Sequence, residues 1–337
     1  MTRALEYFAW WADKNRLPHL LYFWLFAALS FTGCVRLAQQ QPARLPQSLP
    51  DSLAAELNIP FTNAFPYQEK FIEIERQYTR LELVLPNRAG TSNITIDYYQ
   101  LRGSKTPNPA IILLPISGGG YEIENHFARH FARHGLAVAL VHRMEIGKIT
   151  PAAPAIDEWL KQNISNQKQV LDWMQTRQEL DSRQIGVFGI SMGGIQTALL
   201  TALDPRVKAA VFGLAAGDLP FVLAHSTEKS IARHRAEYLR AHNMTLEEFQ
   251  AELRKAITYD PNLLAPYVDP KKVLLVLGMC DTVVPFPKGW ELRGKLGRPE
   301  TVLLPTGHYT AILCVPYLKY RCLRFFRHHL QLGKRPA

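Results

Sequence analysis

Residues 185–193 read Ile-Gly-Val-Phe-Gly-Ile-Ser-Met-Gly, and this stretch decides the fold of the chain. Its first four residues form a short apolar run that suits a strand buried on both faces. The run leads through Gly189-Ile-Ser191-Met-Gly193 directly into a helical pattern that begins near Met192. A strand that turns sharply into a helix needs neighbours without side chains on both sides of the turn. The stretch therefore predicts a strand, a glycine-flanked turn that displays Ser191, and a helix.

The alternation of strand and helix continues on both sides of this stretch. Residues 78–85 and 94–101 alternate apolar and polar side chains, as half-exposed antiparallel strands do. Continuous apolar runs, typical of strands buried on both faces, lie at 110–114, 136–141, 185–189, 207–214, 273–277 and 301–304. Helical stretches separate the runs, at 121–134, 158–178, 192–202, 287–295 and 309–330. This order predicts an α/β fold with a doubly wound, mostly parallel sheet, helices on both faces and antiparallel edge strands at the start.

The composition indicates an ordinary globular chain. Of its 337 residues, 47% are hydrophobic and 20% are charged, which is enough for a large buried core. A formal net charge of +10 is compatible with nucleic acid or an anionic membrane as a partner, but the basic residues are scattered and match no nucleic-acid-binding motif. Four cysteines are too few for a disulfide framework, and their spacing suggests no zinc site. We therefore expect no nucleic-acid partner, no metal and no cofactor.

The first 34 residues differ from the rest of the chain. Basic residues precede an apolar run at 20–29, and small residues and Cys34 follow it, which is the order found in secretion signals. Thr-Gly-Cys34 also resembles the lipobox of bacterial lipoproteins, in which the cysteine is lipidated. The alternatives are an uncleaved membrane anchor, since 17–33 approaches the roughly 20 apolar residues of a spanning helix, and a buried core helix. The first two predict a protein of the cell envelope that is attached to the membrane, with its domain outside the cytoplasm.

Two further segments stand apart from the alternation. Residues 35–77 are mostly polar and punctuated by prolines, so we expect a tether or extended arm, followed by one domain over 78–333. Within that domain, residues 217–262 interrupt the alternation with charged helical stretches at 226–241 and 246–257. An insertion at this point would hang over the carboxyl ends of the strands, where ligands bind in open α/β sheets. We therefore predict a helical lid, with a merely peripheral helical hairpin as the alternative.

A serine at a tight turn can act as a nucleophile only if a base takes its proton. Most of the eleven histidines lie in helical, charged surroundings or in the basic tail. His308 differs, because it lies on a loop between a short strand and a helix, where an imidazole can reach the carboxyl edge of the sheet. Asp281 follows the buried run 273–277 and can orient that imidazole, and the order Ser191, Asp281, His308 is the one expected for an elbow serine. Asp218, which follows the preceding strand, is the alternative acid. Its other interpretation is a helix cap or a loop-closing residue.

The stretch 113–121, Leu-Leu-Pro-Ile-Ser-Gly-Gly-Gly-Tyr, predicts a loop that stabilises negative charge. It follows the strand at 110–114, and its three glycines free backbone N–H groups to approach a ligand closely. The Met192 N–H, at the start of a helix, points at the same developing charge. We expect Met192 together with Ser117 and Gly118 to form an oxyanion hole. A phosphate-binding loop is the weaker interpretation, because no Lys-Ser/Thr pair follows as a P-loop requires.

Taken together, these segments resemble the α/β-hydrolase superfamily over about residues 78–333. The segment from Asp260-Pro-Asn through Gly278, Asp281 and Val284-Pro285 is similar to the dienelactone-hydrolase and prolyl-oligopeptidase-like branches. The resemblance implies a serine hydrolase with Ser191 as nucleophile, Asp281 as acid and His308 as base. One departure concerns the stretch 113–121, which we call the glycine loop. Its glycines follow Pro-Ile-Ser, whereas the family has His-Gly-Gly-Gly, and this leaves open which backbone N–H completes the oxyanion hole.

The expected activity is hydrolysis of a carboxylic ester, of the carboxylesterase or lipase kind, through an acyl-serine intermediate. The expected partners are a small-molecule or lipid acyl ester and, through the N-terminal segment, a membrane. The alternative is a membrane-tethered, non-catalytic binding protein on the same fold, because fold does not fix function. A peptidase is a third possibility, disfavoured because the chain has no room for a propeller domain.

Overall fold

A central sheet organises the chain in the computed structural model, which describes residues 34–41, 45–51, 53, 66–88, 90, 92–144 and 153–330. Among these residues, ten strands form one sheet in the order β1-β10-β9-β8-β7-β5-β6-β4-β3-β2. The strands are β1 Val35–Leu37, β2 Gln68–Ile74, β3 Tyr78–Pro86, β4 Asn93–Leu101, β5 Asn108–Leu114, β6 Ala137–Val141, β7 Leu180–Ile190, β8 Val207–Gly213, β9 Val273–Gly278 and β10 Glu300–Leu304.

The six central strands, β5 to β10, are parallel to one another. The strands β2, β3 and β4 add to one edge in antiparallel fashion, and β1 adds to the other edge. All eight strands expected from the sequence are present, so the predicted α/β fold with a mostly parallel sheet and antiparallel edge strands is confirmed. The parallel strands all end at the same edge, which is therefore the place where loops from distant parts of the sequence meet.

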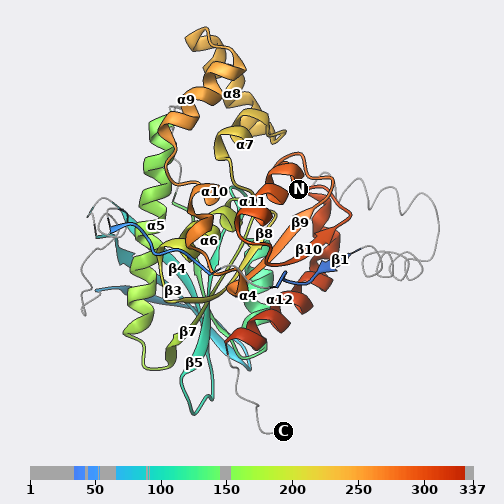
Figure 1. Cartoon of the computed structure of the whole chain (residues 1–337). Coiled ribbons are helices and arrows are strands. Elements are labelled where there is room, and N and C mark those ends of the chain that lie inside the picture. Colours follow the sequence, from blue (N-terminus) through green and yellow to red (C-terminus); the bar gives the residue numbers. More distant parts are fainter. Residues whose placement is uncertain are drawn as a thin grey trace, which may run out of the picture.

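Helices cover both faces of this sheet (Figure 1). On one face, Phe127 of α4 and Phe326 of α12 pack on strand residues such as Ile111. On the other face, Trp173 of α5 packs in the same core as Ile112. Adjacent residues of β5 thus face opposite layers, because side chains alternate along a strand. The helices are α4 Glu122–Arg133, α5 Ala153–Gln175, α6 Met192–Leu203, α7 Leu219–His225, α8 Lys229–His242, α9 Leu246–Ala256, α10 Pro261–Leu264, α11 Phe286–Lys295 and α12 Val315–His329, with 3₁₀ turns η1 Ala265–Tyr267, η2 Pro270–Lys272 and η3 Thr310–Cys314.

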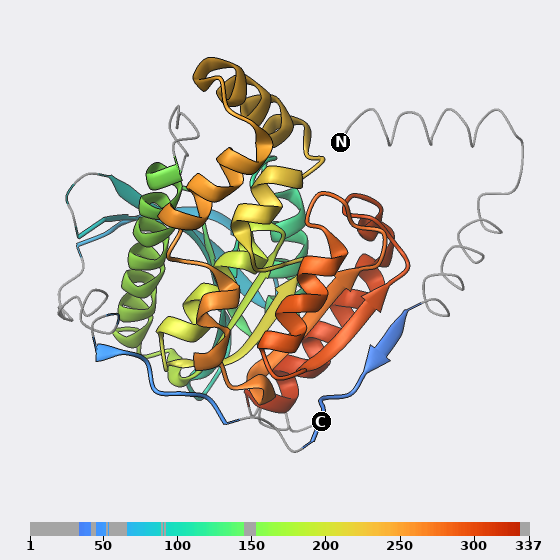
Figure 2. The same ribbon diagram turned by 45° about the horizontal axis from the view of Figure 1, so that its top comes forward.

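The segment 35–77 is not only a tether, which corrects the sequence prediction. Its first described part, β1, pairs with β10 at one edge of the sheet, and β2 pairs with β3 at the opposite edge (Figure 2). Both strands are mostly exposed, so their sequences lack the apolar signal of a core strand. Pairing nevertheless satisfies backbone N–H and C=O groups that would be left open at the edges of the sheet.

The predicted signal peptide or membrane anchor, residues 1–34, lies outside the described residues except for Cys34. The Cys34 side chain is half-buried, and burial together with the neighbouring Cys314 raises the pKa of its thiol to about 12. Within the described part of the chain, no helix is both long and apolar enough to span a bilayer. Lipidation of Cys34 stays a prediction.

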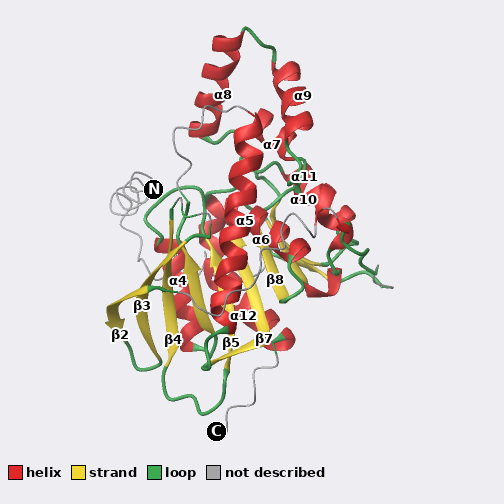
Figure 3. Cartoon of the chain, turned by 90° about the vertical axis from the view of Figure 1, so that its left-hand side faces the viewer, coloured by secondary structure: helices red, strands yellow, loops and turns green. Residues whose placement is uncertain are grey.

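The insertion 217–262 contains α7, α8, α9 and the start of α10, and the α8–α9 pair projects beyond the carboxyl edge of the sheet (Figures 1 and 3). Its base is attached to the body of the domain. The Thr227 N–H donates to the carbonyl oxygen of Thr282 at 3.2 Å, and the two hydroxyl oxygens lie 2.8 Å apart. The insertion is therefore helical and placed where a lid would be, and its action as a lid stays a prediction.

Candidate active site

Ser191 lies at the turn between β7 and α6, in a backbone conformation that residues other than glycine rarely adopt (φ 58°, ψ −123°). A Cβ added to Gly189 would lie 2.2 Å from the carbonyl oxygen of Gly193. A Cβ added to Gly193 would lie 2.2 Å from the carbonyl oxygen of Leu114. Both positions therefore require glycine, and the strained turn holds the serine at the carboxyl edge of the sheet.

The structure brings together the three predicted catalytic residues, Ser191, His308 and Asp281, which we call the relay. The Nε2 atom of His308 lies 3.0 Å from the Oγ atom of Ser191, and its Nδ1 atom lies 2.7 Å from the Oδ2 atom of Asp281. His308 stands between β10 and η3, and Asp281 between β9 and α11, so both come from loops at the same edge as the serine. The Asp281 carboxylate accepts a hydrogen bond from the protonated Nδ1 of His308. The Nε2 atom therefore carries no proton and can accept the proton of the serine hydroxyl.

The carboxylate of Asp281 is held in place independently of the histidine. Its Oδ1 atom accepts hydrogen bonds from the backbone N–H groups of Val283 and Val284, each at 2.9 Å. The side chain is buried, with 2% of its surface exposed, whereas that of His308 is 11% exposed. Two N–H donors on one oxygen leave the other oxygen directed at the imidazole, so the ring orientation follows from the fold of the loop.

The alternative acid, Asp218, is not part of this relay, and the structure therefore corrects that prediction. Its carboxylate lies 2.6 Å from Nζ of Lys288 and 3.2 Å from Nη2 of Arg254. It also caps α7 by accepting the N–H of Phe221 at 3.4 Å. The left-handed backbone conformation at Asp218 (φ 55°) turns the side chain toward α9 and α11, so it joins the insertion to the domain instead of reaching His308.

Two of the three expected oxyanion donors, Met192 and Ser117, line one cavity. Met192 is the first residue of α6, where backbone N–H groups have no partner within the helix. In the glycine loop, the N–H of Ile116 donates to Oε1 of Glu124 at 2.8 Å and is therefore occupied. Ser117 and Gly118 are the donors predicted in this loop, and their role remains a prediction.

The glycine loop is fastened by Arg143, a residue that the sequence analysis did not single out. Its Nη1 donates to the carbonyl oxygens of Ile116 at 3.2 Å and Gly118 at 3.0 Å, and its Nη2 donates to that of Gly119. The guanidinium lies over the ring of Tyr121, 4.4 Å from its centroid, and the Arg143 N–H donates to the Tyr121 hydroxyl at 2.9 Å. The only signal in the sequence was its place just after a buried strand.

Charged groups behind the loop extend this arrangement into the sheet. Glu124 is buried, and burial raises the pKa of its carboxyl above the usual value, although the Ile116 N–H opposes this. Asp97 of β4 lies 2.7 Å from Arg80 and 3.2 Å from Nε2 of His142. Burial alone would raise the pKa of Asp97, but these two partners outweigh it and hold that pKa below its usual value.

Together, the sheet, the strained elbow and the relay of Ser191, His308 and Asp281 define the class of the protein: the chain has the α/β-hydrolase fold and is a serine hydrolase. Among the described residues, no group of three or more His, Cys, Asp or Glu side chains could hold a metal ion.

Comparisons with known proteins agree with this class. Residues 153–304 match the model of the prolyl oligopeptidase family. Among solved structures, the chain is similar to an acetyl xylan esterase from Paenibacillus sp. R4, with a TM-score of 0.65 and 20% identity, over 83% of this chain and 93% of that one. It is also similar to acetyl xylan esterase 1 from Thermoanaerobacterium sp. JW/SL YS485 (TM-score 0.58, 17% identity, 82% of this chain and 95% of that one).

A further similar structure is a cold-adapted esterase from an Arctic intertidal metagenomic library (TM-score 0.53, 17% identity, 79% of this chain and 99% of that one). No curated protein sequence matches the chain. At these identities the likeness establishes the fold.

Proposed function

We propose that this serine hydrolase is a carboxylic ester hydrolase that works through an acyl-serine intermediate. The observation that carries the proposal is the hydrogen-bonded relay, with 3.0 Å between Ser191 Oγ and His308 Nε2 and 2.7 Å between His308 Nδ1 and Asp281 Oδ2. These distances suit proton transfer from the hydroxyl to the imidazole. A non-catalytic binding protein would have no need of an intact relay on a strained turn.

The reaction follows from these positions. His308 Nε2 takes the Ser191 proton as Oγ bonds to the ester carbonyl carbon, and Asp281 stabilises the imidazolium. The carbonyl oxygen becomes an oxyanion, which the N–H groups of Met192 and the 117–118 segment would stabilise. When the C–O bond to the alcohol breaks, His308 returns its proton to the leaving alkoxide. Water then attacks the acyl-serine with His308 as base again, and the acid and the free serine are released.

Esters are favoured over peptides because the similar structures named above are described as esterases, two of them as acetyl xylan esterases. Short acyl esters such as 4-nitrophenyl acetate are therefore the first substrates to test. The match to the prolyl oligopeptidase family keeps a peptidase as the second candidate. A dipeptide 4-nitroanilide assayed beside the acetate would distinguish the two activities.

A fluorophosphonate probe, which reacts with activated serines, tests the nucleophile directly. We expect wild type to be labelled and to hydrolyse 4-nitrophenyl acetate, and Ser191→Ala to do neither. Ser230→Ala is a matched control, because Ser230 Oγ lies 3.4 Å from Nδ1 of His234 on the exposed surface of α8. Equal labelling of wild type and Ser191→Ala would overturn the assignment.

We further propose, from the residues before Cys34, that the protein is attached to a membrane in the cell envelope. The basic start, the apolar run and the cysteine support this placement. The intact mass of the mature protein distinguishes the alternatives. Cleavage before Cys34 with an added lipid supports the lipoprotein form, an uncut chain in the membrane fraction supports an anchor, and an uncut chain in the soluble fraction excludes attachment.

A further inference from the structure

A cavity of about 290 Å³ begins at Met192 and Ser117, two of the predicted oxyanion donors. Its other walls come from the first residues of β4, the ends of β5 and β6, and the helices α5 and α6. Neither Ser191 nor His308 lines it. The cavity therefore adjoins the reaction centre without including the relay.

The position of the cavity in the sheet identifies the part of the ester that it can hold. Ser191 follows β7, and His308 and Asp281 follow β10 and β9 on one side of it. The cavity is built on β5, β6 and β4, which lie on the other side of β7. The leaving alcohol must face His308, because that residue returns the proton to it. The cavity on the opposite side is consequently placed for the acyl group.

The helical wall of this cavity carries amide side chains: Asn163, Asn166 and Gln167 from α5, and Gln196 from α6. Nε2 of Gln167 donates to Oε1 of Gln196 at 2.6 Å. Gln167 is only 2% exposed, and its Oε1 has no hydrogen-bond partner. An unpaired buried acceptor costs about 1–3 kcal/mol, so a bound group with a hydroxyl donor would offset this penalty.

The charges around the cavity favour a neutral ligand. Arg143 lines it, but its guanidinium already donates to three carbonyl oxygens of the glycine loop. His142 also lines it and is paired with Asp97. Among the described lining residues there is no carboxylate, and Trp159 and Met144 supply apolar surface. Such a wall suits a short acyl chain with one hydrogen-bonding group.

We propose that this cavity binds the acyl group of the ester and selects a short, neutral acyl chain that carries a hydroxyl. The inference rests on the proposed ester hydrolysis and names the acyl part of its substrate. A hydroxyl both donates and accepts, so it can pair with the Oε1 of Gln167 and with a neighbouring amide N–H at once.

The test compares ethyl 3-hydroxybutyrate with ethyl 3-methylbutyrate, which differ only by a hydroxyl in place of a methyl group. We expect kcat/KM of wild type to favour the hydroxy ester at least about tenfold, because a site that hydrogen-bonds a hydroxyl discriminates against an analogue without it. Gln167→Met keeps the length of the side chain and removes both polar atoms, and should bring the ratio close to one. Gln162→Met, on the exposed side of the same helix, should leave the ratio unchanged.

Rates are expressed per fluorophosphonate-reactive serine, so that partly folded preparations can be compared. If Gln167→Met does not fold, Asn166→Leu takes its place, since Asn166 is only partly buried. A wild-type ratio of one or less, or a ratio that both cavity variants retain, overturns the inference even when 4-nitrophenyl acetate is hydrolysed. Absence of turnover on the acetate and both ethyl esters, with no labelling of Ser191, overturns the proposed function itself.

Discussion

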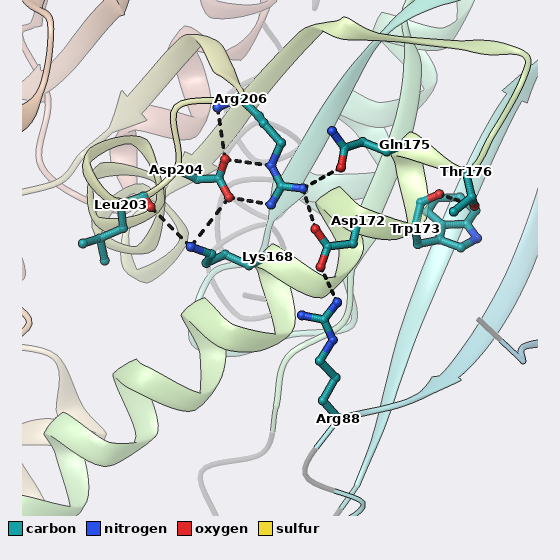
Figure 4. Close-up of polar contacts among 9 residues, drawn as sticks. All are labelled: Arg88, Lys168, Asp172, Trp173, Gln175, Thr176, Leu203, Asp204 and Arg206. Carbon is teal, nitrogen blue, oxygen red and sulfur yellow. Dashed lines mark hydrogen bonds and ion pairs between the residues drawn. The ribbon is translucent and has the colours of Figure 1, made fainter. Parts of the chain in front are cut away.

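Helix α6 has a hydrogen-bonded network at each of its two ends, and the aspartates in the two networks have different partners. At its start, Ser191 meets His308 and Asp281. At its end, Asp204 forms a two-pronged ion pair with Arg206, at 2.8 and 2.6 Å (Figure 4). We call the start of α6, which carries the relay, the chemical end of the helix. We call its other end, which carries the ion-pair network, the structural end.

In the ion-pair network at the structural end, the aspartates pair with arginines, which stay charged at all relevant pH values. Asp172 of α5 lies between two guanidinium groups, 2.5 Å from Nη2 of Arg88 and 2.5 Å from Nη1 of Arg206 (Figure 4). It joins α5 to the β3–β4 turn and to the α6–β8 connection. Asp281, in contrast, has two backbone N–H donors and an imidazole, whose proton can move. Permanent partners fix a position, whereas a titratable partner allows turnover.

The strongest test of this contrast removes the charge from the chemical end. Asp281→Asn keeps an oxygen for the N–H groups of Val283 and Val284, but its amide N–H favours the wrong tautomer of His308. We expect kcat to fall by about 10⁴, as a lost tautomer does in other serine triads. The rate on 4-nitrophenyl acetate and the urea-unfolding midpoint should be measured together.

Asp218→Asn is the matched control for that change, because Asp218 was the alternative acid and its carboxylate pairs with Lys288 and Arg254 instead of His308. Its kcat should stay close to that of wild type. A larger loss of kcat in Asp218→Asn than in Asp281→Asn would reverse the assignment of the acid.

A second test concerns Arg143, a permanently charged residue that holds the glycine loop beside the relay. Arg143→Met removes the donors that hold the carbonyl oxygens of Ile116, Gly118 and Gly119. We expect kcat to fall by about 10², because a small displacement of a catalytic group has that effect, while KM changes less. Arg143→Lys should recover little, since an ammonium cannot reach three carbonyls as the planar guanidinium does. An unchanged kcat would show that the loop keeps its position without the clamp.

The relay could be predicted from the sequence because each member follows an apolar run, and parallel strands bring their carboxyl ends to one edge. Local patterns therefore located Ser191, Asp281 and His308 without knowledge of any contact. The same patterns gave all eight strands with a strong apolar signal. The edge strands β1 and β2 escaped, because they are short or polar and gain their stability from pairing with the sheet.

The support around the site could not be predicted, because its contacts involve groups that leave no pattern in the sequence. Arg143 binds backbone carbonyl oxygens, which every residue has. Gln167 and Gln196 are 29 positions apart on two helices, and in sequence each reads as an ordinary polar helix position. Asp218 was ambiguous for a related reason: a loop aspartate after a strand can cap, pair or catalyse, and only its three-dimensional neighbours decide.

A third test removes a charge from the structural end. Asp172→Asn leaves two partly buried guanidinium groups without their shared carboxylate, whose side chain is 9% exposed. We expect the free energy of unfolding to fall by about 2–4 kcal/mol, because Arg88 and Arg206 each lose a hydrogen bond to a charged group, while Arg206 keeps its pair with Asp204. The catalytic rate of the folded enzyme should not change. Asp181→Asn, whose partner Arg183 is exposed, is the control and should leave the stability close to that of wild type. Equal losses in the two variants would contradict the structural role of the network.

The smallest effect is expected at Asp97, which has both kinds of partner: the permanent charge of Arg80 and the titratable ring of His142. Because the pKa of Asp97 is lowered in the folded protein, its ionised form contributes stability above the pKa of an unfolded aspartate, near pH 4, and this contribution is lost as the pH falls further. At neutral pH we expect Asp97→Asn to cost about 1–2 kcal/mol, as for a hydrogen bond to a charged group. Urea unfolding of both proteins between pH 7 and pH 3 measures this: the two stability curves should converge toward acid pH. Curves that stay parallel over that range would show that the Asp97 carboxylate gains nothing from Arg80 and His142.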